Sequence, residues 1–101
     1  MHLEYSEQSI IDLDNIINYI AKDSKSRALQ YIDKMKSKIE LLVDTPNIGV
    51  LCKEKNINLN CRIFIFEHYL VFYTIKENNI QIKRVLHSSV NYVDTFNQGV
   101  K

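Results

Sequence analysis

The sequence contains little glycine, proline or cysteine, and these shortages exclude several kinds of protein. Only two of its 101 residues are glycine, Gly49 and Gly99, so it has no glycine-rich loop that could hold a phosphate group. It has one proline, and it contains no repeat, low-complexity tract or linker. We therefore expect a single domain over residues 1–101 with one modest core.

The sequence also lacks a long hydrophobic run. The longest uninterrupted stretch, "YLVFYTI" at residues 69–75, falls far below the roughly 20 apolar residues that cross a bilayer. The first residues, "MHLEYSEQS", have neither the basic nor the apolar region of a secretion signal. A cytoplasmic location and no membrane partner are expected.

The two cysteines, Cys52 and Cys61, lie nine residues apart without the spacing or the companions of a zinc site. We expect no metal and no cofactor. Because the cytosol disfavours disulfides, the interpretation from sequence is a reduced, partly buried pair.

A strong positive charge is missing as well. The formal net charge is +1, with six basic against eight acidic residues in 1–50 and seven against four in 51–101. This is a mild asymmetry and not a basic patch. Since nucleic-acid binding draws on many neutralised phosphates, stand-alone nucleic-acid binding is disfavoured.

The first half shows helical periodicity. Ser6 is a plausible N-cap, and after it apolar residues recur at helical spacing at Ile10, Leu13, Ile16, Ile17, Ile20 and Ala21. Ser24 can cap a second helix, whose apolar residues are Ala28, Ile32, Met35, Ile39 and Leu42, and which ends before Pro46 and Gly49. Two amphipathic helices joined by a short connection are expected to pack as an antiparallel hairpin.

The second half changes to strand-like segments. "CRIFIF", "YLVFYTI" and "IQIKRVL" are rich in β-branched and aromatic residues, and the turn-sized breaks "EH" and "KENN" separate them. With "HLEY" as a further strand, the expectation is an α+β fold in which the helical hairpin packs on a small antiparallel sheet, in the order β-α-α-β-β-β.

Two arginines lie within these strands. Strand alternation places Arg84 on one face with Ile80, Ile82 and Leu86, and the opposite face then carries Gln81, Lys83, Val85 and His87. Arg62 alternates with Phe64 and Phe66 in the same way. A charge among apolar neighbours must be paired, lie at the rim, or line a cleft. Residues 89–101 are interpreted as a tail that could be mobile.

The ordered pieces "DL..I..YI..DS..RA", "P.IG", "YLVFY" and "RVLH" resemble the ParE/RelE superfamily of toxins from type II toxin–antitoxin systems, and most closely its ParE branch. The resemblance covers residues 3 to about 88. It implies a strand, a helical hairpin and an antiparallel sheet. It also implies a growth-arresting toxin, in some cases a plasmid-stabilising one, that a cognate antitoxin neutralises.

The superfamily implies two mechanisms. RelE-like toxins are ribosome-dependent mRNA endoribonucleases, and metal-free RNA cleavage requires a base, an acid and fixed positive charge. At the positions where that branch is basic this chain has Cys61, Ile63 and Leu70. Under the ribonuclease alternative the catalytic candidates are the four residues Arg62, Arg84, His87 and Tyr92.

ParE-like toxins are thought to poison DNA gyrase by holding its cleaved-DNA intermediate, and this requires no chemistry by the toxin. We favour this interpretation, with the antitoxin and gyrase as partners and with Arg62, Tyr73, Arg84 and His87 as candidates for binding them. Ribosome and mRNA are partners only under the alternative. A third possibility is an inactive toxin fold that serves as a protein-binding module.

Overall fold

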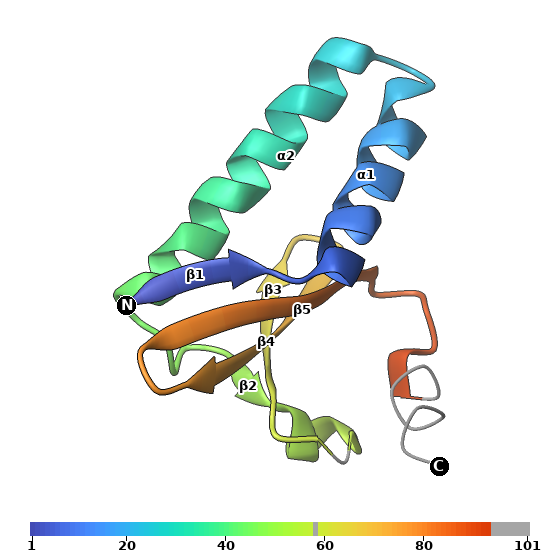
Figure 1. Cartoon of the computed structure of the whole chain (residues 1–101). Coiled ribbons are helices and arrows are strands. Elements are labelled where there is room, and N and C mark those ends of the chain that lie inside the picture. The colour runs from blue at the N-terminus through green and yellow to red at the C-terminus, as the bar shows by residue number, and fades with distance from the viewer. Residues whose placement is uncertain (58, 94–101) are drawn as a thin grey trace.

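A computed structural model describes residues 1–57 and 59–93 (Figure 1). Its main elements are, in chain order, β1 (His2–Tyr5), α1 (Glu7–Ala21), α2 (Lys25–Glu40), β2 (Val50–Leu51), β3 (Arg62–Phe66), β4 (Tyr69–Lys76) and β5 (Asn79–His87). The α+β class and the helical hairpin are confirmed. No helix in these two ranges is long and apolar enough to cross a membrane. Most of the predicted tail, residues 94–101, lies outside the described residues.

The sheet has five strands in the order β1-β5-β4-β3-β2. β3, β4 and β5 form the predicted antiparallel meander, and the two-residue β2 adds an edge strand. β1 pairs in parallel with β5, so the sheet is mixed where a purely antiparallel one was expected. The backbone N–H of His2 donates to Asn78 and that of Ser6 donates to Ile82, which fixes a direction that the residue types of "HLEY" do not encode.

Both predicted N-caps are present. Ser6 accepts a hydrogen bond from the N–H of Ser9, and Ser24 accepts one from the N–H of Arg27. In α1 the buried face is centred on Ser9, Asp12, Leu13 and Ile16. Ile10 was expected in this stripe, but it is 49% exposed because it follows Ser9 by about 100° around the helix.

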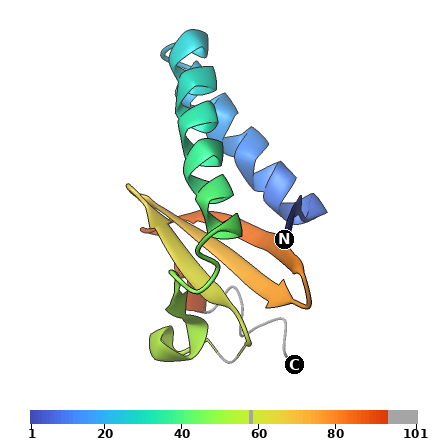
Figure 2. The same ribbon diagram turned by 90° about the vertical axis from the view of Figure 1, so that its left-hand side faces the viewer.

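The main core lies between the hairpin and one face of the sheet (Figure 2). The predicted apolar residues of the second helix are all buried, and four of them belong to this core: Ile32, Met35, Ile39 and Leu42. Opposite them the sheet contributes Phe66, Val71, Tyr73, Ile80, Ile82 and Val85. The burial of apolar side chains between the helical layer and the sheet therefore holds the hairpin on the sheet.

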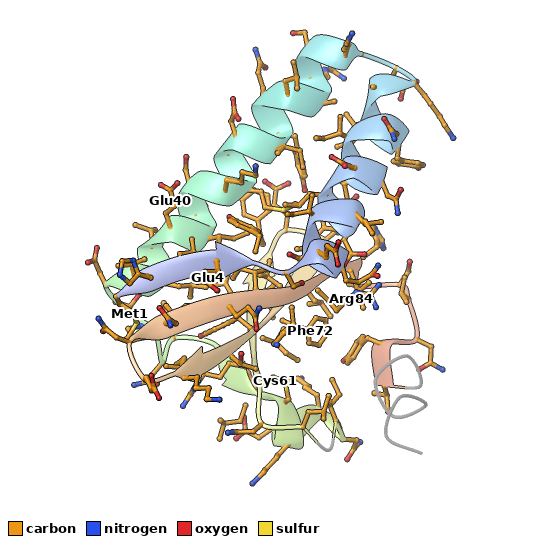
Figure 3. All side chains as sticks on the ribbon, in the orientation of Figure 1. Met1, Glu4, Glu40, Cys61, Phe72 and Arg84 are labelled. Atoms are coloured by element: carbon orange, nitrogen blue, oxygen red, sulfur yellow. A yellow bond between two sulfur atoms is a disulfide. The ribbon has the colours of Figure 1, made fainter. Side chains whose placement is uncertain are left out.

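A second apolar cluster occupies the face of the sheet away from the helices, and a 3₁₀ turn at Cys52–Lys55 packs there (Figure 2). Its buried members are Cys52, Ile57, Cys61, Ile63, Leu70, Phe72 and Leu86. Figure 3 labels two of them, Cys61 and Phe72. The sheet thus has apolar side chains packed on both faces.

The cysteine prediction is wrong: Cys52 and Cys61 form a disulfide. The pairing of β2 with β3 brings the two Cα atoms to 5.2 Å, a separation that a disulfide spans, and the N–H of Cys52 donates to the carbonyl of Cys61 at 2.9 Å. The spacing of the two cysteines along the chain does not predict the disulfide, because their distance in space depends on how the 52–61 segment folds back.

A β-bulge alters the predicted alternation in β5. Phe72 pairs with Arg84, but Tyr73 pairs with Ile82, so Lys83 of β5 has no residue opposite it on β4. Ile80, Ile82 and Val85 consequently join the core under the helices, whereas Leu86 joins the second cluster. The expectation that Ile80, Ile82, Arg84 and Leu86 share one face is therefore wrong beyond the bulge.

Candidate functional site

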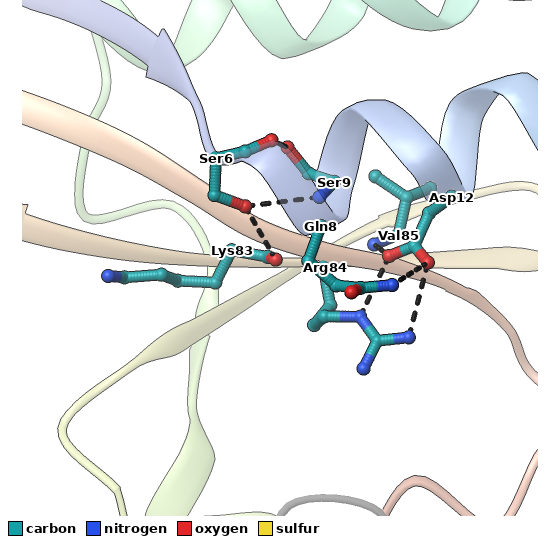
Figure 4. Close-up of polar contacts among 7 residues, drawn as sticks. All are labelled: Ser6, Gln8, Ser9, Asp12, Lys83, Arg84 and Val85. Atoms are coloured by element: carbon teal, nitrogen blue, oxygen red, sulfur yellow. Dashed lines mark hydrogen bonds and ion pairs between the residues drawn. The ribbon is translucent and has the colours of Figure 1, made fainter.

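Arg84 is held by a buried carboxylate of α1. Its Nε donates to Oδ2 of Asp12 at 2.8 Å, and its Nη2 donates to Oδ1 at 3.1 Å (Figure 4). The N–H of Val85 donates to the same Oδ2 at 2.9 Å. Asp12 is only 6% exposed, whereas the Arg84 side chain is 25% exposed. This two-point ion pair satisfies the requirement for a partner that the sequence pattern placed on Arg84.

The contact with Asp12 is not alone in joining the start of α1 to the bulge in β5, since the N–H of Ser6 also donates to the carbonyl of Ile82. The hydroxyl of Ser6, besides capping the helix, donates to the carbonyl of Lys83 at 2.9 Å (Figure 4). Sequence reasoning did not select Asp12. The available signal was a carboxylate inside the apolar stripe of a helix, which requires a partner as Arg84 does.

Arg62 and Tyr73 bind the segment between α2 and β2. Nη1 of Arg62 donates to the carbonyls of Asn47 and Gly49 at 3.1 and 2.8 Å. The Tyr73 hydroxyl donates to the carbonyl of Pro46 at 2.7 Å and accepts from the N–H of Gly49 at 2.9 Å. Burial raises the pKa of Tyr73, against the opposing effects of the Gly49 N–H and of Arg62.

Gly49 is required by this arrangement because a side chain there has no room. A Cβ atom at this position would lie 2.6 Å from the Tyr73 hydroxyl oxygen and 2.9 Å from the carbonyl oxygen of Ile63. The "P.IG" piece of the sequence is thus the segment that Arg62 and Tyr73 hold against the sheet.

His87 lies at the exposed end of β5. Its Nδ1 is 2.7 Å from the hydroxyl of Ser89 and accepts from the N–H of the same residue at 3.1 Å. Its ring meets the Tyr69 ring edge-on at 5.3 Å and stacks with His68 at 6.1 Å between centroids. These rings belong to an open hollow of about 540 Å³, here called the aromatic hollow, lined by Tyr19, Ile20, Tyr31, Glu67, His68, Tyr69, His87 and Ser89.

Tyr92, the fourth ribonuclease candidate, packs against the second cluster. Its ring lies 5.7 Å from that of Phe72. Arg84 and His87 line a common hollow of about 310 Å³, whereas Arg62 and Tyr92 line two others. None of the hollows described is lined by all four candidates.

Metal ligands do not gather either. Within residues 1–57 and 59–93, no group of three histidine, cysteine or acidic side chains is placed to hold a metal ion. In the part of the chain that the structure describes, Arg62 on β3 and Arg84 on β5 are both hydrogen-bonded within the protein, and the aromatic hollow is open to solvent.

Comparisons with known proteins agree with this fold. The chain matches the family model "ParE toxin of type II toxin-antitoxin system, parDE" over residues 3–92. A solved structure titled "Chromosomal ParDE TA system from P. aeruginosa" has 22% sequence identity and a TM-score of 0.70, with 86% of this chain and 95% of that chain covered. Curated protein sequences give no match. On the extent of the family match, the chain belongs to the ParE family of toxins from type II toxin–antitoxin systems.

Proposed function

We propose that this ParE-type toxin arrests growth by poisoning DNA gyrase, without chemistry of its own, and that a cognate antitoxin neutralises it. The observation that carries the proposal is the burial of Cys61, Ile63 and Leu70 in the second cluster. These are the positions where the ribonuclease branch is expected to be basic. In this chain they build apolar core and present no cation to a phosphate.

The engagement of both arginines supports the same proposal. The guanidinium of Arg84 binds Asp12, and that of Arg62 binds two loop carbonyls. A phosphate clamp needs donors that are free when RNA arrives. Releasing Arg84 would leave the Asp12 carboxylate buried without its cation, which is costly.

Poisoning requires only a surface that prefers one state of the target, since a ligand shifts an equilibrium by its differential affinity. The test uses purified toxin, gyrase and plasmid DNA. We expect loss of supercoiling or accumulation of cleaved DNA in proportion to the toxin added. Undisturbed supercoiling at a large excess of folded toxin contradicts the proposal.

For the antitoxin we propose an acidic, largely disordered segment that folds along the helical hairpin and the sheet edge. The positive excess lies in the carboxyl half of the chain, which contains β3, β4 and β5, so the acidic residues of the segment should lie along the sheet and its apolar residues along the hairpin. The outer surface of the hairpin exposes apolar side chains at Ile10, Ile11, Tyr19 and Leu29. Calorimetry of the complex should show the negative heat-capacity change of coupled folding and binding. Binding without that change, by a preformed globular partner, argues against this mode.

One observation favours the ribonuclease alternative enough to require a test: Arg84 and His87 line the same hollow. A His87→Gln variant removes the titratable ring from an exposed position, so the fold should persist. Under gyrase poisoning, growth arrest should stay within a few-fold of the parent. Under RNA cleavage, loss of the proton donor should reduce it on the order of 10²-fold or more. A Ser88→Ala variant, at the exposed neighbouring position, provides the control.

A further inference from the structure

The aromatic hollow lies between the helical hairpin and one end of the sheet. α1 contributes Tyr19 and α2 contributes Tyr31, while His68 comes from the β3–β4 turn. Tyr31 meets Tyr69 edge-on with centroids 6.0 Å apart, and Tyr69 meets His87 in the same way at 5.3 Å. A continuous array of rings therefore forms one side of an open space of about 540 Å³.

Tyr19 of α1 also lines the hollow and is highly accessible. It is 69% exposed, more than any other large hydrophobic side chain in the described part of the chain. A tyrosine in this setting contributes little to the core. It instead offers contact area at low cost in conformational entropy, which is the property of tyrosines at protein interfaces.

Charges of both signs lie around the hollow. At its rim Glu67 pairs with Lys34 at 3.5 Å, and the Lys22 ammonium lies 5.7 Å from the centre of the Tyr19 ring. An incoming cation would meet Lys22 and Lys34, and an incoming anion would meet Glu67. A neutral group is the best electrostatic match.

The phenols of the array are neutral groups too. Burial, with the Glu67 carboxylate as the next cause, raises the pKa of Tyr31 to about 12, and burial also raises the pKa of Tyr69. Neutral rings with exposed edges prefer offset and edge-to-face contacts with another ring. A planar, uncharged aromatic group therefore fits both the charge and the geometry of the site.

We propose that the aromatic hollow is the anchor site for an aromatic side chain of the antitoxin segment. The inference rests on the proposed function, in which that segment follows the helical hairpin, because both helices contribute rings to the hollow. The hollow is then a binding hot spot, since aromatic anchors in partly desolvated pockets carry much of the affinity of an interface.

The test uses N-acetyl-tryptophanamide as a neutral aromatic probe. The chain contains no tryptophan, so indole fluorescence reports only on the probe. Its three histidines give assignable ring signals in proton NMR, and exposed His2 is outside the hollow. We expect the His68 and His87 signals to shift with a dissociation constant on the order of 1 mM, while the His2 signal stays in place.

Variants and matched probes make the result decisive. Tyr19→Ala should weaken binding of the probe by about 3- to 10-fold, since one aromatic pair is lost, and exposed Leu41→Ala, outside the hollow, should leave it unchanged. N-acetyl-leucinamide and N-acetyl-argininamide should bind several-fold more weakly. Equal shifts of all three histidines, equal binding of the three probes, or full binding by Tyr19→Ala would each overturn the proposal. None of these measurements depends on gyrase, so failure here is separable from failure of the toxin assay.

Discussion

Removing either partner of the Asp12–Arg84 ion pair should destabilise the protein, because the Asp12 carboxylate is almost completely buried. Asp12 is 6% exposed and accepts four hydrogen bonds, two from Arg84, one from the N–H of Val85 and a long one from the Gln8 side chain. Arg84→Ala removes two of the four and leaves the charge of Asp12 in place. Asp12→Ala instead leaves the guanidinium and the Val85 N–H without their acceptor.

The expected loss of stability depends on how deeply each partner of the ion pair is buried. Breaking a fully buried pair costs about 3–5 kcal/mol. Because the Arg84 side chain is 25% exposed, solvent replaces part of the lost interaction, and we expect about 2 kcal/mol for Arg84→Ala. Asp12→Ala should cost about 3 kcal/mol, since it also breaks the bond to Val85. The double variant should then reveal a coupling of about 1–2 kcal/mol.

Urea unfolding followed by circular dichroism measures all three variants. Exposed Arg27→Ala controls for loss of an arginine and should change stability by less than about 0.5 kcal/mol. A coupling energy near zero, or an Arg84→Ala protein as stable as the Arg27→Ala control, would refute the assignment of Arg84 as the partner that holds α1 on the sheet.

Three further perturbations test other parts of the structure. Gly49→Ala should lower stability by about 1–3 kcal/mol in urea unfolding, because the new Cβ meets the Tyr73 ring, and unchanged stability would refute the crowding. Reduction of Cys52–Cys61 with dithiothreitol should cost about 2–3 kcal/mol, whereas Cys52→Ser should not respond to the reductant. Burial, with the Glu67 carboxylate as the next cause, raises the pKa of Tyr31 from 10.0 to about 12, so its stabilising contribution is complete below pH 10 and is lost as pH rises toward 12. Tyr31→Phe should flatten that alkaline loss in thermal melts, and an identical pH profile would contradict it.

The elements of the fold were predictable because each has a local cause. Ser6 and Ser24 mark helix starts through cap chemistry, and the change from helical to strand-like patterning marks the passage to the sheet. The parallel pairing of β1 was not predictable from its four residues, because direction depends on which strand is left unpaired at the edge. The bulge at Lys83 was missed for a related reason, since register is a property of two strands together.

The candidate site was predictable residue by residue but not as an arrangement. The pattern indicated that Arg84 needs a partner, yet Asp12 is 72 positions away in the sequence, and only the packing of α1 on β5 brings the two side chains together. The aromatic hollow was likewise not predictable as an arrangement. Its tyrosines and histidines are scattered over both helices and two strand ends, so no window of the sequence contains the motif.

We propose that this ParE-type toxin acts on gyrase without cutting RNA. The most direct measurement applies one preparation of folded toxin to two cell-free reactions, plasmid supercoiling by gyrase and translation-coupled mRNA cleavage on ribosomes. We predict that supercoiling is lost or cleaved DNA accumulates while the mRNA stays intact. Codon-dependent mRNA cuts together with normal supercoiling would contradict the account.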